Sequence, residues 1–481
     1  MSFIRNIIVK KNRKLLYGIL SCTCILSFSL VLVIGSGGCY SYPDIPASID
    51  KDNYTSLKSS EHRSLPLETR TLTLDLAKEV ALANNPDFLS AKEAVTGAWA
   101  RFYSAFSAYL PTSNAYYNLT EYQYTPGIDG RNVYDIKGGG IQAQWVIFDG
   151  LMTTMNVLSA RYSAKEAEAQ NRDARRLLIY GVATSFNQVL LSKAKIRIAK
   201  EDETFNEELL KETQIKYEAG AVPLTDPLNF KVKANLAKSN RIAAEYSYYI
   251  NKCILAQLLG LTDGVVPPEI EFPDIEVKIE SFPIDISVYL DTALRNRPDL
   301  EAYRRALVAA KYNLWSTYGA FAPTVTLVAT PISYLRTDAG YKGRYHIRPH
   351  SEDKGINYGF QANWVLFNGG QNIANMRQAQ ALLAQSELGL TGKWIQVLSQ
   401  VRQSYENCKQ SASQTILFQE NLELYRRTRD LVNEEYRAGN TSITRLNETQ
   451  RDLVQAETDL VTYEINLENA KAQLNSSVGG E

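Results

Sequence analysis

Residues that commonly perform covalent or metal chemistry are few in this 481-residue chain. It contains three histidines and five cysteines. His346 and His350 stand in the polar stretch TDAGYKGRYHIRPHSED, where we expect a solvated loop rather than a metal site. The sequence shows no glycine-rich phosphate-binding loop, no CxxC pair and no nucleophile elbow. We therefore expect a protein that is not an enzyme and that uses no cofactor or metal.

The charges of the chain are balanced, with 52 Lys plus Arg and 52 Asp plus Glu. Proteins that bind nucleic acids usually carry a marked excess of basic residues, so the composition argues against a nucleic-acid partner. The length suffices for two or three ordinary domains and does not by itself indicate an unusual shape.

An export signal is predicted at residues 1–38. Basic residues precede the apolar run 15–34, and small residues lead into Cys39 in the sequence GSGGC. This sequence resembles the cleavage box of bacterial lipoproteins, which implies that Cys39 is acylated. It departs from that pattern at Ser36, where an aliphatic residue is usual. The alternative is an uncleaved single-span anchor, because about twenty apolar residues can cross a bilayer.

The chain contains an internal duplication. Four motifs recur in the same order at a separation of roughly two hundred residues: NNPD and NRPD, AYLPT and AFAPT, WVIFDG and WVLFNGG, and YEAG and YRAG. The prolines between the two copies indicate a linker. We predict a linker at 39–70, a first copy at 71–261, an inter-copy linker at 262–284, a second copy at 285–476 and a tail at 477–481.

Each copy is predicted to start with a helix and two strands. The helix begins near Pro86 or Pro298, with asparagine caps nearby, and ends before the next proline. Alternation of apolar and polar residues then predicts the strands, at about 112–124, 138–148, 324–335 and 356–367.

A very long helix follows in each copy, because long proline-free stretches keep one helical face apolar. Its length would be roughly 100 Å. Glycines in YEAG and YRAG predict turns at Gly220 and Gly439, after which the chain reverses into shorter helices at 225–261 and 442–475.

The four predicted strands have one aromatic-rich face and one face of Asn and Gln. This pattern suits a sheet with lipid on one side and water on the other, although a soluble sandwich strand alternates in the same way. A membrane-spanning sheet must close, and small closed barrels need about eight strands or more. A barrel would therefore need two or three copies of the chain.

The duplicated order of strands, long helix, glycine turn and return helix, with WVIFDG and WVLFNGG at the strand ends, resembles the TolC-like outer membrane efflux protein family. The resemblance covers roughly residues 70–476. It implies a mainly α fold with β, in which duplicated helical hairpins form a trimeric α-barrel. Four strands per chain would contribute to a shared twelve-stranded transmembrane β-barrel.

The resemblance also implies a function. The protein would be the outer-membrane channel of a tripartite efflux or type I secretion system in a Gram-negative bacterium. It would form a passive conduit from the periplasm to the exterior. Its partners would be two further copies of itself, a periplasmic adaptor, an inner-membrane pump or secretion ATPase, and outer-membrane lipid.

Carried over position by position, the resemblance assigns roles to residues at both ends of the long helices. Asp226 and Arg445 would supply opposite charges for a periplasmic gate. Trp145 and Trp364 are expected at the membrane interface, or packed where strand turns into helix. The residues expected to dock the adaptor are Gly220, Ala221, Val222, Gly439, Asn440 and Thr441.

Two further hypotheses are compatible with the sequence. A periplasmic coiled coil tethered by a lipid at Cys39, with a structural or adhesive role, is the alternative function. Cys253 and Cys408 fall at similar distances from the two turns, which leaves a disulfide open, although similar height does not establish contact.

Overall fold

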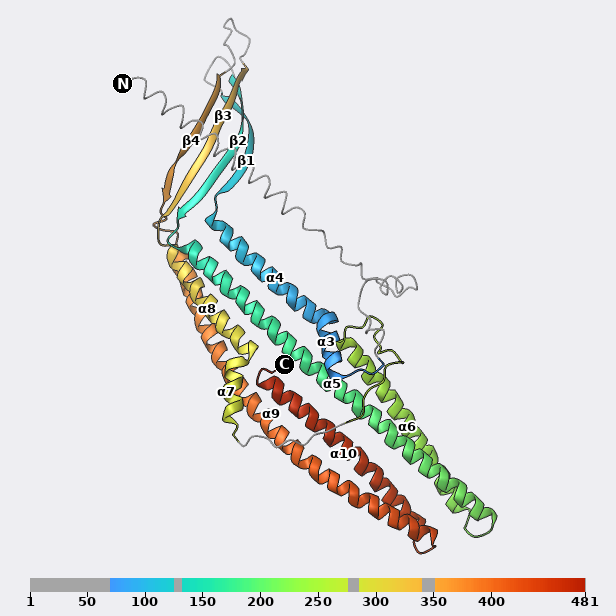
Figure 1. Ribbon diagram of the computed structural model, residues 1–481. Helices are drawn as coiled ribbons and strands as arrows, with labels where there is room; N and C mark the ends of the chain where they lie inside the picture. Colours follow the sequence, from blue (N-terminus) through green and yellow to red (C-terminus); the bar gives the residue numbers. More distant parts are fainter. Residues whose placement is uncertain (1–69, 125–131, 276–284, 340–350, 481) are drawn as a thin grey trace. The chain divides into compact units, whose positions relative to one another are not determined.

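The structure is a computed structural model that describes residues 70–124, 132–275, 285–339 and 351–480. Its elements occur in two copies with the same order of long helices and strands (Figure 1). The first copy consists of α3 (Leu74–Asn84), α4 (Pro86–Phe106), the 3-10 helix η1 (Ser107–Tyr109), β1 (Thr112–Tyr124), β2 (Asn132–Phe148), α5 (Met152–Glu218) and α6 (Thr225–Leu258). The second copy consists of α7 (Ser287–Asn296), α8 (Pro298–Gly319), β3 (Thr324–Ala339), β4 (Ser351–Asn363), α9 (Gln371–Arg437) and α10 (Ile443–Ser477).

The four strands form one antiparallel sheet in the order β1-β2-β3-β4. Among the described residues, β1 and β4 each pair with a single strand, so the described sheet has two open edges. β2 begins earlier than predicted, at Asn132, because the glycines at 138–140 remain paired with β1. Sequence alternation underestimates this strand, since glycine interrupts the apolar pattern without interrupting the backbone ladder.

The prediction for the end of β4 was wrong. The strand was expected to reach residue 367, but it ends at Asn363. Asn363 pairs with Thr324, the first residue of β3, so β3 offers no further backbone to pair with the residues that follow. Trp364 therefore lies just beyond the strand and not within it.

The two long helices, α5 and α9, each contain 67 residues. At about 1.5 Å per residue each is roughly 100 Å long, as the absence of proline predicts. Each begins directly after a residue in the left-handed conformation, Leu151 with φ 68° and Gly370 with φ 85°. These residues turn the chain from strand into helix.

No helix among the described residues combines the length and the apolar composition needed to cross a membrane.

The helices pack in a defined order. In the two hairpins, α6 packs along α5, and α10 packs against both α5 and α9. The four hairpin helices therefore lie side by side in the order α6, α5, α10, α9. In the part of the helices that leads to the sheet, α8 packs against both α5 and α9, while α4 packs along α5. Each copy thus supplies one hairpin, and the two hairpins meet through α5 and α10.

The largest apolar core lies where α3, α5, α6 and α10 meet the segment that follows α6. Val182, Val189 and Leu255 are fully buried there, together with Val266 of that segment. A backbone bond from Leu72 N–H to the Glu271 carbonyl (2.9 Å) holds the segment beside the start of the first copy.

Two short helices, α3 and α7, precede the helices that were predicted to begin at Pro86 and Pro298. Asn85 and Arg297 adopt extended conformations, as residues before proline favour, and so separate each short helix from the next one. Asn85 caps α4 by accepting a bond from Phe88 N–H, as predicted. The predicted asparagine cap is wrong for α8, because Arg297 occupies that position and provides no side-chain cap.

Candidate functional site

The first hairpin turn is built at the end of α5. Gly220 and Ala221 donate their N–H groups to the carbonyl oxygens of Tyr217 (2.9 Å) and Lys216 (2.8 Å). These bonds satisfy carbonyls that a helix end otherwise leaves free, and they need a left-handed residue at Gly220, whose φ is 74°. The glycine therefore explains where the chain reverses.

The second turn has the same backbone arrangement. Gly439, with φ 77°, and Asn440 donate to the carbonyls of Tyr436 (3.0 Å) and Glu435 (2.9 Å). A Cβ atom at Gly220 or Gly439 would meet no atom of a described residue within 4 Å. Both glycines are thus required by the backbone conformation rather than by crowding, and both turns present open surface.

The helices that leave the two turns begin differently. The Ser442 hydroxyl caps α10 by accepting a bond from Arg445 N–H (3.4 Å). Leu224, at the equivalent start of α6, forms no side-chain cap. Pro223 and Pro227 stiffen this first turn instead, and Pro227 is buried. The two turns therefore share a backbone but present different chemistry.

The two hairpins are joined close to their turns. Gln450 of α10 donates to the Asp202 carboxylate of α5 at 3.0 Å, and burial raises the pKa of Asp202. An apolar cluster takes one buried residue from each of the four helices: Leu209, Phe230, Val432 and Leu446. This packing fixes the relative position of the two turns within one chain.

An electrostatic contact also links the turns. Lys216 Nζ lies 5.5 Å from the centre of the Tyr436 ring and 2.7 Å from the Glu212 carboxylate. Burial raises the pKa of the Tyr436 hydroxyl, and the negative charges of Asp226 and Glu212 raise it further. Asp226 of the first hairpin therefore acts on Tyr436 of the second. Sequence reasoning missed Tyr436, although a tyrosine three residues before each motif glycine was the available signal.

The two predicted gate residues stay apart in the single chain. Asp226 is half-buried and accepts a bond from the Thr225 hydroxyl (3.4 Å), whereas Arg445 is exposed. Neither side chain forms an ion pair with any residue that the structure describes. Their role in a gate stays a prediction, and so does adaptor docking at the turns.

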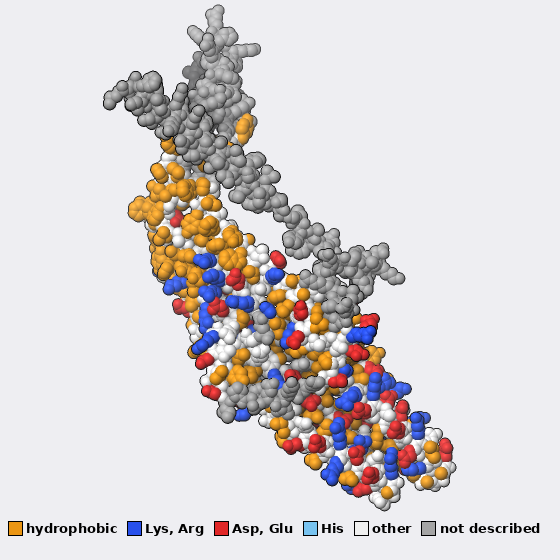
Figure 2. All heavy atoms as spheres, in the orientation of Figure 1, with side chains coloured by type: hydrophobic (Ala, Val, Ile, Leu, Met, Phe, Trp, Pro, Cys, Tyr) orange, Lys and Arg blue, Asp and Glu red, His pale blue; other side chains and the backbone are white. Residues whose placement is uncertain are grey.

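Trp145 and Trp364 bind the ends of the preceding helices. The Trp145 indole N–H donates to the Tyr109 carbonyl at 2.8 Å, and the Trp364 indole N–H donates to the Phe321 carbonyl at 3.0 Å. Both rings remain partly exposed, at 42% and 59%. On the face drawn in Figure 2, hydrophobic side chains gather where the helices approach the sheet, and charged ones become frequent towards the turns. Placement at a membrane interface remains a prediction.

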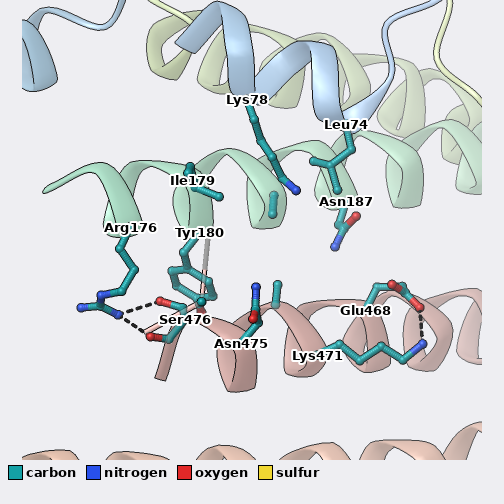
Figure 3. Close-up of a pocket in the computed structure, with 13 residues that line it drawn as sticks. Leu74, Lys78, Arg176, Ile179, Tyr180, Asn187, Glu468, Lys471, Asn475 and Ser476 are labelled. Carbon is teal, nitrogen blue, oxygen red and sulfur yellow. Dashed lines mark hydrogen bonds and ion pairs between the residues drawn. The ribbon is translucent and has the colours of Figure 1, made fainter. Parts of the chain in front are cut away.

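A pocket of about 260 Å³ lies between α3, α5 and α10 (Figure 3). Lys78 reaches towards it from α3, and Lys471 pairs with Glu468 at 2.8 Å on α10. Arg176 of α5 is buried and donates to Ser476 at the end of α10 (2.7 Å to the carbonyl). Arg176 thus connects α5 to α10, and the carboxylate beside Lys471 balances its charge.

The cysteines of the described residues are free thiols, Cys253 and Cys408. Burial raises the pKa of Cys408 to about 11, so this thiol stays protonated and unreactive at neutral pH. The predicted lipidation residue Cys39 and the loop residues His346 and His350 lie outside the described residues. Within the described part of the chain, no group of three or more His, Cys, Asp or Glu side chains is placed to hold a metal ion.

Comparison with known proteins identifies the class to which this architecture belongs. The family model described as outer membrane efflux protein matches residues 78–261 and 289–480, one match for each copy. The chain belongs to the outer membrane efflux protein family.

Two curated relatives carry names from efflux and secretion. The chain is 27% identical over 265 residues to the alkaline protease secretion protein AprF of Pseudomonas aeruginosa, which covers 53% of the chain and 52% of that protein. It is 23% identical over 416 residues to the outer membrane efflux protein BepC of Brucella suis, which covers 85% of the chain and 86% of that protein. The alignment thus spans about half of AprF and most of BepC.

The fold is also that of a solved channel. The Campylobacter jejuni CmeC outer membrane channel superposes with a TM-score of 0.74 at 16% identity, covering 92% of this chain and 91% of that one. The mainly helical, duplicated fold with four antiparallel strands is confirmed. The alternative of a tethered coiled coil finds no support among these relatives.

Proposed function

We propose that the protein is the outer-membrane channel of a tripartite efflux or type I secretion system. It conducts substrate passively from the periplasm to the exterior, and energy comes from other chains. The observation that carries the proposal concerns the surfaces through which the two internal repeats of one chain contact each other. The equivalent surfaces on the outer sides of the two repeats are left open within one chain. Further copies of the same chain would cover these surfaces.

The hairpin level gives the first example. α10 lies between α5 and α9, and over its described span Ile443–Ser477 no large hydrophobic side chain is exposed. Its counterpart α6 packs along α5 and carries an exposed apolar stripe. The stripe consists of Leu228, Val232, Leu236, Ile242, Tyr246, Tyr249, Ile250 and Ile254. Such a stripe along one helix marks an interaction surface.

The level next to the sheet repeats the pattern. α8 packs against α9 of its own copy and against α5 of the first copy, where Ser159 donates to the Ala309 carbonyl at 3.0 Å. α4 packs against α5 of its own copy, and its aromatic side chains Tyr103 and Phe106 are exposed. By analogy, α9 of another chain would cover α4.

These open surfaces are complementary in a head-to-tail sense. If α9 of one chain lies against α4 and α6 of the next, and β4 pairs with β1 of the next, repetition of the contact closes a ring. The strand count requires more than one chain, and the family resemblance favours three. Three chains give a twelve-stranded barrel in the outer membrane, continued by a helical barrel in the periplasm.

The open turns at Gly220, Ala221 and Val222 and at Gly439, Asn440 and Thr441 would dock the periplasmic adaptor. Asp226 and Arg445 would narrow the periplasmic end through contacts with neighbouring helices, and Tyr436 would join them. An acyl group on Cys39 would anchor the chain to the outer membrane. The inner-membrane partner would be a pump or a secretion ATPase.

Planar-bilayer conductance tests the proposal. Protein extracted from outer membranes as a heat-resistant oligomer should produce discrete, long-lived conductance steps. A water-soluble single chain that produces none would contradict the channel and favour the tether. Crosslinking from positions 221 and 440 in cells should capture an adaptor, whose identity distinguishes efflux from secretion.

A further inference from the structure

A second, larger cavity lies at the bend between α7 and α8. Its volume is about 550 Å³. We call it the arginine pocket, and its walls are Arg172, Arg295, Asn296, Arg297, Pro298, Glu301 and Gly479. Three guanidinium groups thus line a cavity with a single carboxylate.

Two of these arginines lack a counter-charge among the residues that the structure describes. Arg297 is buried, and its guanidinium group is already paired because it donates two hydrogen bonds to Asp299 (2.9 and 2.6 Å). The Glu301 carboxylate is bound by Arg305. Arg172 and Arg295 are exposed, and their side chains form no ion pair or hydrogen bond with any residue in the described part of the chain. The pocket therefore carries an excess of positive charge.

The first copy shows that these charges are not needed to build the bend. Gly479, with φ 86°, sits so close to Asn296 that a Cβ atom would lie 2.9 Å from its carbonyl carbon. Gly260, with φ 68°, makes the same close approach to Asn84 in the first copy.

The residue three before the bend proline is Arg295 in the second copy and Ala83 in the first. The residue 22 positions after the strand-end glycine is Arg172 in α5 (172 − 150) and Thr391 in α9 (391 − 369). The bend of the first copy therefore forms with a neutral residue at the position of Arg295, and α9 forms with a neutral residue at the position of Arg172.

We propose that the arginine pocket binds a ligand that bears an oxyanion, either a phosphate or a carboxylate. A planar guanidinium group binds both through two parallel N–H bonds, and two such groups lie on different walls of the pocket. The cavity begins at the N-terminal end of the 22-residue helix α8, where the helix dipole favours negative charge. A volume of this size admits a small organic anion as well as an inorganic one.

The proposal does not depend on the channel function, because every wall of the pocket belongs to one chain. Binding of inorganic phosphate and of succinate to the full-length protein would be measured by isothermal titration calorimetry. We expect one of them to bind with a Kd of about 1 mM or tighter, and the one that binds identifies the oxyanion.

Arg172→Gln and Arg295→Gln should each weaken binding about tenfold. Arg427→Gln, which removes an exposed arginine of α9 far along the helix from the pocket, should leave it unchanged. Unaltered thermal unfolding of each variant establishes that the chain still folds.

Three results would overturn the proposal. These are the absence of binding of either anion up to about 10 mM, binding by the two pocket variants as tight as that of the unmodified protein, and an equal loss of binding in Arg427→Gln. The last result would show attraction to surface charge in general rather than a site.

Discussion

In the first copy Asn85 stabilises the bend between α3 and α4, and in the second copy Arg297 stabilises the bend between α7 and α8. The Asn85 amide donates to the Leu258 carbonyl at the end of α6 (3.0 Å). The Arg297 guanidinium donates to the Ser477 carbonyl at the end of α10 (3.2 Å). The same backbone task is thus performed by a neutral group in one copy and by a charged one in the other. Only the second copy then needs a buried carboxylate to balance the charge.

The largest expected effect follows from removing that carboxylate. Asp299 binds Arg297 and also Lys393 Nζ at 2.9 Å, and all three side chains are largely buried. Asp299→Asn should lower the free energy of unfolding by about 3–5 kcal/mol, because it leaves two buried cations without a negative counter-charge. Asp87→Asn changes the equivalent exposed residue of the first copy and should cost under about 0.5 kcal/mol. Thermal unfolding followed by circular dichroism measures both, and equal effects would contradict the comparison.

The same contrast predicts a pH dependence. Burial by itself would raise the pKa of Asp299, but hydrogen bonds and charges from Arg297 and Lys393 outweigh it and hold the pKa well below its usual range. A carboxyl with a lowered folded pKa stabilises the fold fully above its unfolded pKa of about 4, and loses this contribution as the pH falls further. Stability should therefore decline below about pH 4. Asp299→Asn should make that decline shallower, and an unchanged acid profile would contradict the assignment.

The strand-to-helix turns differ in a second way. A Cβ atom at Gly150 would lie 2.6 Å from Ala322 Cβ and 2.6 Å from the Gly319 carbonyl oxygen, because this turn packs against the end of α8. At Gly369, the equivalent residue of the second copy, a Cβ atom would meet nothing within 4 Å. A contact that the first copy makes inside the chain is therefore left open in the second.

Gly150→Ala should destabilise the chain by about 2–4 kcal/mol, through the clash and through strain at φ 68°. Within one chain, Gly369→Ala introduces only the backbone strain and should destabilise the fold by about 1 kcal/mol. If another chain covers this turn, Gly369→Ala should instead reduce the yield of heat-resistant oligomer on semi-native gels. Normal assembly of Gly369→Ala would argue against that contact.

The smallest effect concerns Leu151, which has φ 68° where the second copy has Gly370. A branched side chain in this conformation destabilises the fold by about 1–2 kcal/mol. Glycine removes this strain, but it also raises the conformational entropy of the unfolded chain, which offsets part of the gain. The free energy of unfolding of Leu151→Gly should therefore equal that of the unmodified chain or exceed it by up to about 1 kcal/mol. Gly370→Leu should show the opposite sign. A marked loss of stability in Leu151→Gly would mean that its side chain makes a contact that outweighs the strain.

Much of the fold was predictable because it is encoded locally and twice. Proline-free stretches set the long helices, and the left-handed requirement at Gly220 and Gly439 sets the turns. The bend partners were not predictable, because the bond from Arg297 to Ser477 joins residues far apart in the sequence. The end of β4 depends on where β3 begins, and the charge of Asp226 acts on Tyr436 only after two hairpins pack. Alternation and propensity carry no information about such pairs.

If several copies of the chain close around one channel, a crosslink should form between neighbouring chains. Ser159 lies nine residues after Gly150 and contacts Ala309, which lies eleven residues after Pro298. The corresponding positions, nine after Gly369 and eleven after Pro86, are Gln378 of α9 and Gly97 of α4, and both are exposed in the single chain.

A chain with Gln378→Cys and Gly97→Cys, in a Cys253→Ser background, would be treated in outer membranes with a short bifunctional maleimide. We expect covalent products of up to three chains with the double variant and none with either single variant. Products confined to one chain, in membranes where the protein is inserted, would contradict this expectation.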